Sequence, residues 1–299
     1  MIPSAFDYVV PRSLEEALAC LGRCEPGTAA LLAGGMSLVP ALKLRFARPA
    51  TLVDVGRIAA LRGIEANAGG IRIGALVTHA ELLGAARLAD RPVFAETARV
   101  IADPQVRNRG TFGGSLAYAH PAADWPAVFL ALGGEAELFG PRGARTVAAG
   151  DFFTGIFGTA IGADEILTGV RFAHAPAHAG AAYSKMRQQA SGMALVGVAA
   201  QLVLDAAGAI RAASVGVTGV NAVPFRARSL EARLQGGAPD PAALGAACAA
   251  GIAEADPLGD RHASVDYRLH LLGVHAGRAL ASALARARGS AGDGAGDGD

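Results

Sequence analysis

Two short segments of the sequence each place a pair of glycines beside hydroxyl side chains. The first is LLAGGMSLVP at residues 31–40, and the second is GTFGGS at residues 110–115. Glycine lets another molecule approach the main chain closely, and successive backbone N–H groups in a turn form a concave site for anions. Serine and threonine hydroxyls add hydrogen-bond donors. Two such loops facing one ligand are suited to a pyrophosphate, and the simpler alternative is a pair of ordinary tight turns.

Neither loop has the spacing of the better-known nucleotide-binding motifs. The sequence contains no G-x-G-x-x-G between an expected strand and an expected helix, and no G-x-x-x-x-G-K-[ST]. A Rossmann-type dinucleotide site and a P-loop are therefore not supported. A G-x-S-x-G sequence is also missing, which disfavours a hydrolase with a serine nucleophile.

Cysteine and charge content limit the other kinds of site. The three cysteines, Cys20, Cys24 and Cys248, are too few for a four-cysteine iron–sulfur cluster, so any such cluster must lie on another chain. The HAPAH segment at residues 174–178 is expected to be a loop rather than a metal-binding pair, because Pro176 breaks the helix that would align its histidines. The 27 basic and 26 acidic residues are scattered along the chain, so nucleic acid is not an expected partner.

The N-terminus and the apolar segments bear on localisation. MIPSAFDYVV lacks the basic and apolar regions of a secretory signal, and no apolar run approaches the roughly 18 residues that a membrane span needs. We therefore expect a cytoplasmic protein without a membrane span. Its 299 residues are enough for about two domains.

The elements that must position the two loops begin with a small unit in residues 1–56. The order of strand, helix, strand, glycine loop, short helix and strand predicts an α/β arrangement. The expected elements are a strand at residues 6–10, a helix from Ser13, a strand at residues 29–32, a short helix through Lys43 and a strand in TLVDVG at residues 51–56.

Residues 57–175 form a second zone, which we expect to be a mixed sheet with helices packed against it. GGIRIGA at residues 69–75 and EAELFG at residues 135–140 have strand patterns. Thr78 and Glu81 have the spacing of a capping box at the start of a helix, and a further helix is expected near residues 93–102.

Residues 178–288 form a third zone with strands first and helices afterwards. The strand-like segments are AAYSKMR, GVAAQLVLD and AIRAASVGVTG, and the helices are expected near residues 226–235, 241–252 and 266–288. This order predicts an α+β domain with an antiparallel sheet. Residues 289–299 are dominated by glycine, alanine and aspartate, so we expect a disordered tail.

Three longer stretches carry a resemblance to a known family. They are LLAGGMSLVPALKLRFARPATLVDVGRI at residues 31–58, IADPQVRNRGTFGGSLAYAHPAADWPAV at residues 101–128, and YSKMRQQASGMALVGVAA at residues 183–200. Together they resemble the FAD-binding medium subunit of molybdenum hydroxylases, the family of the carbon monoxide dehydrogenase and xanthine dehydrogenase flavin subunits. The resemblance implies an α+β fold with a two-part FAD-binding domain of the vanillyl-alcohol-oxidase-like (PCMH) type, followed by a C-terminal domain of antiparallel sheet plus helices.

The same resemblance implies a set of cofactor-contacting positions in this chain. The two glycine loops match the segments that hold the FAD pyrophosphate, Asp124 matches an acid that contacts the cofactor, and Leu167 matches a position beside the isoalloxazine. Lys185 matches a lysine near the flavin, where it could favour negative charge on the reduced ring. The full set is Leu32, Ala33, Gly34, Gly35, Met36, Ser37, Ile101, Thr111, Phe112, Gly113, Gly114, Ser115, Asp124, Leu167 and Lys185.

Three of these positions also have simple local explanations. Ile101 fits a buried helix residue, and Lys185 fits a solvated lysine on a strand. Asp124 fits an N-cap for a helix that begins at Trp125. One carboxylate oxygen could cap the helix while the other contacts the cofactor. Two other positions depart from the family pattern, since Met36 and Met193 stand where relatives have polar or aromatic residues. A thioether can pack on a ring but does not stack like tyrosine, which leaves the flavin potential open.

The function implied by the resemblance is electron transfer by an FAD-carrying subunit, with no catalytic side chain of its own. The expected partners are a molybdopterin-binding large subunit and an iron–sulfur small subunit, assembled as a dimer of heterotrimers. Electrons are expected to pass from the partner's iron–sulfur clusters to an external acceptor. The alternatives are a stand-alone FAD-dependent oxidase or dehydrogenase of the same flavin fold, and a non-catalytic assembly protein that has lost FAD.

Overall fold

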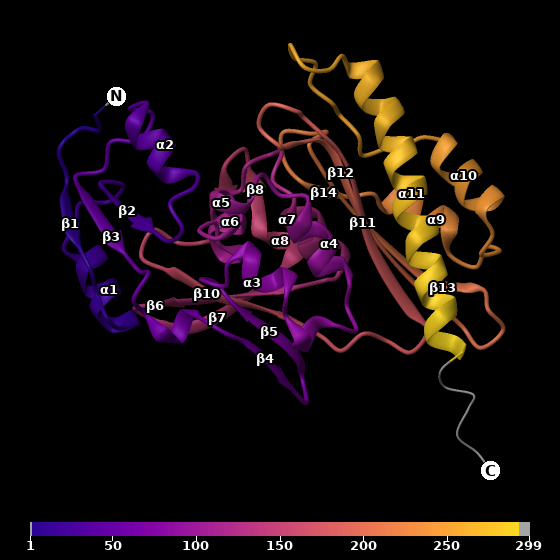
Figure 1. Cartoon of the computed structure of the whole chain (residues 1–299), viewed down its shortest axis with the longest axis horizontal. Helices are drawn as coiled ribbons and strands as arrows, with labels where there is room; N and C mark the ends of the chain where they lie inside the picture. Colours follow the sequence, from indigo (N-terminus) through magenta and orange to yellow (C-terminus); the bar gives the residue numbers. More distant parts are fainter. Residues whose placement is uncertain (1, 293–299) are drawn as a thin grey trace.

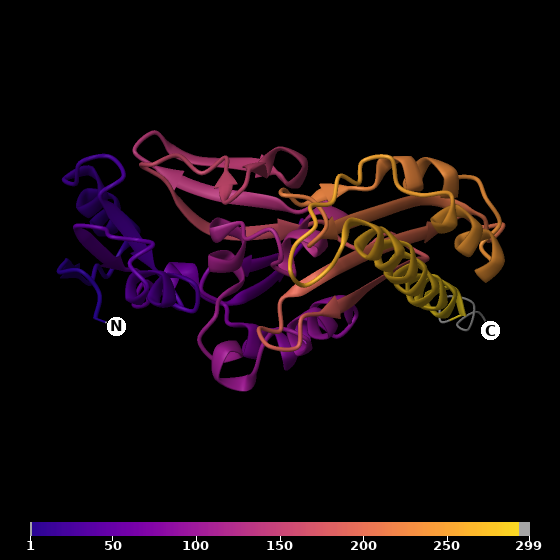
Figure 2. The same cartoon turned by 90° about the horizontal axis from the view of Figure 1, so that it is seen from above.

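The computed structural model describes residues 2–292 of the chain. Its parts follow one another along the long axis of the molecule, from an N-terminal unit at the left to a C-terminal sheet with its helices at the right (Figure 1). Seen from above, the first and last parts lie at opposite ends (Figure 2). None of the helices within residues 2–292 combines the length and apolar character of a membrane-crossing segment.

The N-terminal unit is a three-stranded parallel sheet with two helices, as expected from the alternation of strand and helix patterns. Its strands lie in the order β1-β3-β2. Ser13 accepts a hydrogen bond from the backbone N–H of Glu16 and so caps the first helix. The elements are β1 (Asp7–Val9), α1 (Leu14–Gly22), β2 (Ala29–Leu32), α2 (Leu38–Lys43) and β3 (Thr51–Asp54).

The central part contains a five-stranded sheet in which every neighbouring pair is antiparallel, so the expectation of a mixed sheet is wrong. The physical reason lies in two tight hairpins. Asn67 pairs with Gly70 and Gly140 pairs with Gly143, and connections this short join only antiparallel strands. The strands, in sheet order, are β4 (Ile64–Asn67), β5 (Gly70–Gly74), β10 (Ile166–Phe172), β6 (Glu135–Gly140) and β7 (Gly143–Ala148).

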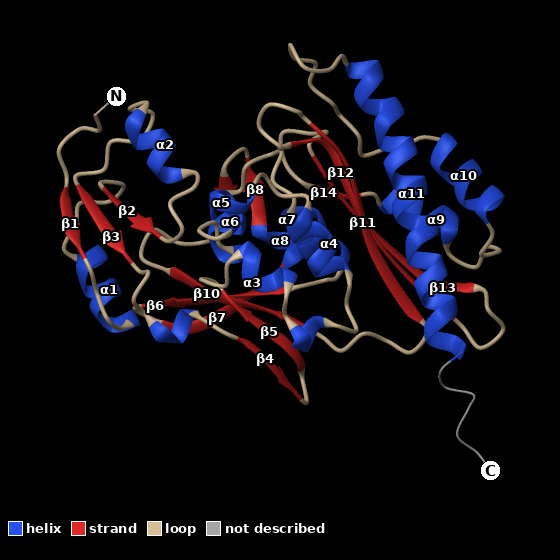
Figure 3. Cartoon of the chain, viewed as in Figure 1, coloured by secondary structure: helices blue, strands red, loops and turns tan. Residues whose placement is uncertain are grey.

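The short helices of the central part gather on one side of this sheet, above it in the view of Figure 3. The capping box expected at Thr78 and Glu81 is confirmed, because each side chain bonds the backbone N–H of the other residue. The helix expected near residues 93–102 ends earlier, at Arg99. The helices are α3 (His79–Leu83), α4 (Val93–Arg99), α5 (Pro104–Arg107), α6 (Phe112–Tyr118), α7 (Trp125–Ala131) and α8 (Ala149–Phe152), with 3₁₀ turns η1 (Ala59–Leu61) and η2 (Ala86–Leu88) and a hairpin of β8 (Phe153–Gly155) and β9 (Gly158–Thr159).

The C-terminal part is an antiparallel sheet followed by helices, and this expectation is confirmed. Its strands are β11 (Ala179–Arg187), β12 (Ala194–Leu204), β13 (Ile210–Thr218) and β14 (Phe225–Arg226). Its helices are α9 (Arg228–Leu234), α10 (Pro241–Ala249) and α11 (Val265–Gly292). Helix α11 continues past residue 288 to Gly292, so the expected tail does not begin at residue 289, and residues 293–299 lie outside the described part.

Both faces of this C-terminal sheet are buried, with alternate residues of β11 pointing to opposite sides. Ala181 and Tyr183 pack on the hydrophobic cluster of the central part, whereas Ala182 belongs to the cluster shared with α11. Two glycines permit the closest approaches. A side chain at Gly180 would overlap the backbone of α11, and one at Gly216 would overlap the backbone of α7. The sheet therefore joins the C-terminal helices to the central part.

Candidate cofactor site

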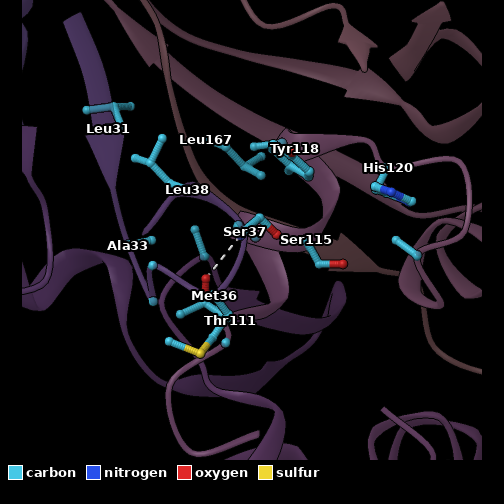
Figure 4. A pocket seen from close by; sticks show the side chains of 18 of the residues that line it. Leu31, Ala33, Met36, Ser37, Leu38, Thr111, Ser115, Tyr118, His120 and Leu167 are labelled. Carbon is cyan, nitrogen blue, oxygen red and sulfur yellow. Dashed lines mark hydrogen bonds between the residues drawn. The ribbon is translucent and has the colours of Figure 1, made fainter. Parts of the chain in front are cut away.

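A cavity of about 590 Å³ opens where the N-terminal unit meets the central part. This volume is in the range typical of small-molecule and cofactor sites. Figure 4 shows Leu31, Ala33 and Leu38 on one side, Tyr118 and His120 on the other, and Ser37 and Ser115 between them. Segments widely separated in the sequence therefore form one elongated site.

Most of the sequence-predicted positions line this cavity. Those that do are Ala33, Gly34, Gly35, Met36, Ser37, Ile101, Thr111, Gly113, Gly114, Ser115, Asp124 and Leu167. The other three, Leu32, Phe112 and Lys185, are not among the lining residues. Phe112 is fully buried and packs edge-on against Trp125, with ring centroids 5.0 Å apart, so it supports the second loop from behind.

The first glycine loop presents a row of free backbone donors. Within the described residues, the N–H groups of Gly34, Gly35, Met36 and Ser37 donate to no protein acceptor. Gly35 has a φ of +78°, a conformation that glycine adopts without strain. Four consecutive unpaired N–H groups at the edge of a cavity are a suitable binding site for an anion.

Gly34 brings the two loops into contact. A Cβ atom at this position would overlap the carbonyl oxygen of Arg109 and would lie 3.0 Å from the Cα of Gly110. Only glycine therefore allows the first loop to lie against the start of the second. The two glycine loops therefore lie side by side.

The second loop differs from the expectation that it also offers free N–H groups. The N–H of Phe112 donates to Val77, that of Gly113 donates to Ala75, and those of Gly114 and Ser115 donate to Thr111. These bonds dock the start of α6 against the segment that follows β5. The Ser115 hydroxyl has no hydrogen-bond partner within the described residues and remains available to a ligand, as does that of Ser37.

Asp124 lies at the cavity wall with one carboxylate oxygen already engaged. Its Oδ1 accepts hydrogen bonds from the Tyr183 hydroxyl at 2.6 Å and from Lys185 Nζ at 2.7 Å. Burial raises the pKa of Asp124, and the bonds from Lys185 and Tyr183 oppose that rise. Asp124 stands at the N-cap position of α7 but makes no side-chain cap bond, so the capping role expected for its carboxylate is not observed.

Lys185 is not the solvated strand lysine that its local sequence suggests. Its side chain is only 2% exposed, and its ammonium group also donates to the carbonyl oxygen of Val100 at 3.0 Å. It lies behind Asp124 rather than on the cavity wall. Its effect on a bound ligand therefore passes through the Asp124 carboxylate.

Ile101 and Leu167 are two further predicted positions that line the cavity. Ile101 follows α4 and is half-buried, which differs from the buried helix residue suggested by its local sequence. The Arg107 guanidinium holds this turn by donating to the carbonyl oxygens of Ile101 and Ala102, at 2.8 and 3.2 Å. Leu167 lies in β10, and its buried side chain contributes an apolar surface to the cavity.

Several residues at the site were not predicted from the sequence. Tyr183 is half-buried, with its hydroxyl behind Asp124, and Gly197 on the neighbouring strand provides room for that hydroxyl. Tyr118 and His120 stack at the far end of the cavity with ring centroids 6.2 Å apart, and Phe157 packs on both rings. Tyr118 and His120 follow the second glycine loop closely in the sequence, and this position could have indicated that they lie near the site.

His79 is another lining residue that the sequence did not single out. It is the first residue of α3 and is 5% exposed. The capping box of Thr78 and Glu81 predicted that a helix starts at this point, but it gave no indication that the histidine lies at the site.

These features fit an FAD molecule on structural grounds. The free N–H groups and the serine hydroxyls can donate hydrogen bonds to its phosphates, and the apolar walls can pack against its rings. The second oxygen of Asp124 accepts no bond from the described residues, so it can accept one from a hydroxyl or a ring N–H of FAD.

Comparison with known proteins agrees with this fit. The family described as the FAD binding domain in molybdopterin dehydrogenase matches residues 4–174. The family described as the CO dehydrogenase flavoprotein C-terminal domain matches residues 181–283. The two matches together account for most of the chain.

Individual relatives are similar over almost their whole length. The chain is 38% identical to the carbon monoxide dehydrogenase medium chain of Hydrogenophaga pseudoflava, covering 96% of this chain and 99% of the relative. It is 39% identical to that of Afipia carboxidovorans, covering 96% and 100%. A solved structure of carbon monoxide dehydrogenase from H. pseudoflava matches with a TM-score of 0.91 at 39% identity, covering 96% of this chain and 99% of that one. The chain belongs to the FAD-binding medium chains of the carbon monoxide dehydrogenase and molybdenum hydroxylase family.

Proposed function

We propose that this chain is the electron-transferring flavin subunit of a molybdenum-containing hydroxylase or dehydrogenase. In this role it takes electrons from iron–sulfur clusters on a small partner subunit and passes them to an external acceptor, while a molybdopterin-binding large subunit carries out the chemistry on the substrate. We further propose a cytoplasmic dimer of heterotrimers. Membership of the medium-chain family supports an assembly of several subunits.

The observation that carries the proposal is the row of free N–H groups from Gly34 to Ser37 at the edge of the cavity. We propose that this row and the Ser115 hydroxyl hold the FAD pyrophosphate, and that Gly114 leaves the space it occupies. FAD supplies the one- and two-electron redox chemistry when it is bound. The protein supplies its position, its polar contacts and the exclusion of water.

The Asp124 and Lys185 pair is proposed to fix the polar contact at the cavity wall. Lys185 and Tyr183 both donate to Oδ1 of Asp124. These two bonds hold the carboxylate in place before a ligand binds, and they leave its other oxygen available to the ligand. Such preorganisation avoids the loss of side-chain freedom on binding. We propose that residues 1–56 and 57–175 form the FAD-binding domain and that residues 178–288 form the C-terminal domain.

The test is substrate-dependent reduction of an artificial dye, measured with the chain alone and with its co-expressed partner subunits. We expect FAD in the assembled protein, released intact by acid, and dye reduction only in the assembly. Turnover of an organic alcohol or amine by the chain alone would instead show a stand-alone oxidase. An assembly that forms without any FAD would show a non-catalytic protein.

A further inference from the structure

The cavity contains a buried histidine in a defined tautomer. His79 lies between the core residue Trp125 and the second glycine loop. Trp125 Nε1 donates a hydrogen bond to His79 Nδ1 at 3.0 Å. Because an indole N–H only donates, Nδ1 must be unprotonated and act as the acceptor.

The charge state of the ring follows from its surroundings. Burial, together with the smaller effect of the positive charge of Arg107, lowers the pKa of His79 to about 4. The ring is therefore neutral near pH 7. Since Nδ1 carries no proton, the single ring proton is on Nε2.

The Nε2–H group has no acceptor in the part of the chain that the structure describes. Nε2 is nevertheless not fully buried, and His79 lines the cavity, so a ligand in the cavity can reach this nitrogen. A Cβ atom at Gly110 would lie 2.8 Å from this nitrogen, so glycine at that position leaves the donor uncovered. An unpaired N–H in a largely buried side chain is costly to leave without an acceptor, which favours a ligand that brings one.

This donor lies close to the contact between the two glycine loops. Gly110 is next to His79 on one side and next to Gly34 on the other. The free N–H groups of the first loop begin at Gly34, so the histidine and the loop approach the same part of the cavity. A ligand group that accepts hydrogen bonds from both must carry several acceptor oxygens.

We propose that His79 is a binding residue for the phosphate-bearing part of FAD, donating its Nε2–H to a phosphate oxygen. This inference rests on the proposed function of the cavity as the FAD site. Trp125 acts as the positioning residue, because its hydrogen bond to Nδ1 keeps the proton on the nitrogen that faces the ligand.

Two matched substitutions separate the two nitrogens. In His79→Asn the amide oxygen can replace Nδ1 and keep the bond from Trp125, but nothing replaces Nε2. In His79→Gln the amide nitrogen can reach the place of Nε2 and donate to the ligand, but the acceptor for Trp125 is lost. The protein is the full chain purified with its co-expressed partner subunits, stripped of flavin and titrated with FAD.

We expect His79→Asn to bind FAD about tenfold or more weakly, the effect of one hydrogen bond to a charged group, and to keep its melting temperature close to that of the wild type. We expect His79→Gln to melt at a lower temperature and to keep FAD affinity within about threefold of wild type. Trp125 is the single tryptophan, so its emission reports directly on its own environment in each variant.

Equal loss of FAD affinity in both variants, or unchanged affinity in His79→Asn, would overturn the assignment. If a histidine variant fails to fold, Gly110→Ala provides a second test, because its methyl group would lie 2.8 Å from Nε2 and so would block the approach of a ligand to this donor or displace the ring. That variant should also lose about tenfold or more in FAD affinity, and unchanged affinity would again contradict the assignment. A wild-type assembly that binds no FAD would overturn the proposed function itself, and this inference with it.

Discussion

Lys185 Nζ and Asp124 Oδ1 form an ion pair of 2.7 Å in which the two side chains are only 2% and 6% exposed. The residues are 61 positions apart in the sequence. A buried charge is tolerated when it is paired and hydrogen-bonded, and here the Tyr183 hydroxyl and the Val100 carbonyl each add a hydrogen bond to the pair. The pair connects the C-terminal sheet to the wall of the cavity.

Removing one partner of this pair should destabilise the protein strongly. We expect Lys185→Met to lower the free energy of unfolding by about 3–5 kcal/mol, because Asp124 would be left as an uncompensated buried charge. The double variant Lys185→Met/Asp124→Asn should recover part of that loss. Urea unfolding followed by Trp125 emission measures these values and that of Asp124→Asn alone, and strictly additive effects of the two single substitutions would argue against the pair.

The contact between the two glycine loops should be essential for the site. We expect Gly34→Ala to reduce FAD content severely, because the new methyl group would overlap the Arg109 carbonyl and push the loops apart. Gly84→Ala is the matched control, since a Cβ there meets nothing within 4 Å and its φ is −108°. Flavin absorbance per protein gives the result, and an equal FAD content in the two variants would show that the loops need not touch.

A branched side chain on the second loop should also prevent binding. In Gly114→Val the Cβ would lie 2.6 Å from Thr111 Oγ1 and 3.8 Å from the Cβ of Ala33, so the valine would fill the space between the loops. We expect a loss of FAD affinity of at least about tenfold, comparable to loss of a hydrogen bond to a charged group. Gly150→Val is the control, because its Cβ meets no neighbour within 4 Å. Full flavin content in Gly114→Val would mean that the pyrophosphate lies elsewhere.

His79 should make the protein sensitive to mild acid. The pKa of His79 is about 4 in the folded protein, compared with the ordinary value of 6.5. Above pH 6.5 the ring is therefore neutral in both the folded and the unfolded chain, and protonation of His79 costs the folded protein no stability. Between pH 6.5 and 4 only the unfolded chain takes up the proton, and the free energy of unfolding should fall by about 1.4 kcal/mol per pH unit, about 3 kcal/mol in all. Below pH 4 this loss levels off.

The measurement is urea unfolding of wild type and His79→Asn between pH 7.5 and 4. Half-buried His120 and buried His275, whose pKa values are also lowered by desolvation, contribute equally to both proteins and cancel in the comparison. Because only wild type loses stability through His79, its free energy of unfolding should fall relative to that of the variant as the pH falls, and wild type should be the less stable of the two near pH 4. A constant difference in stability between the two proteins would show that His79 is not held neutral by its surroundings.

Much of the local structure could be predicted from the sequence because short-range interactions determine it. The capping box of Thr78 and Glu81 and the cap at Ser13 involve backbone groups only three residues away. The strands and helices of the C-terminal part followed from their apolar patterns. The glycine loops were identified from residue type and spacing, and the family resemblance indicated that they share one cofactor.

Interactions between distant segments could be decided only by the tertiary structure. The sequence could not show that the second loop uses its N–H groups to bind Val77 and Ala75, or that the central sheet is antiparallel throughout. It favoured a solvated Lys185, because a lysine on a strand is usually exposed, whereas the fold places it against a buried carboxylate. The tautomer of His79 likewise depends on Trp125, 46 positions away. Hydrogen-bond partners and burial are properties of the packed chain, and for that reason the chemistry of these side chains became visible only in three dimensions.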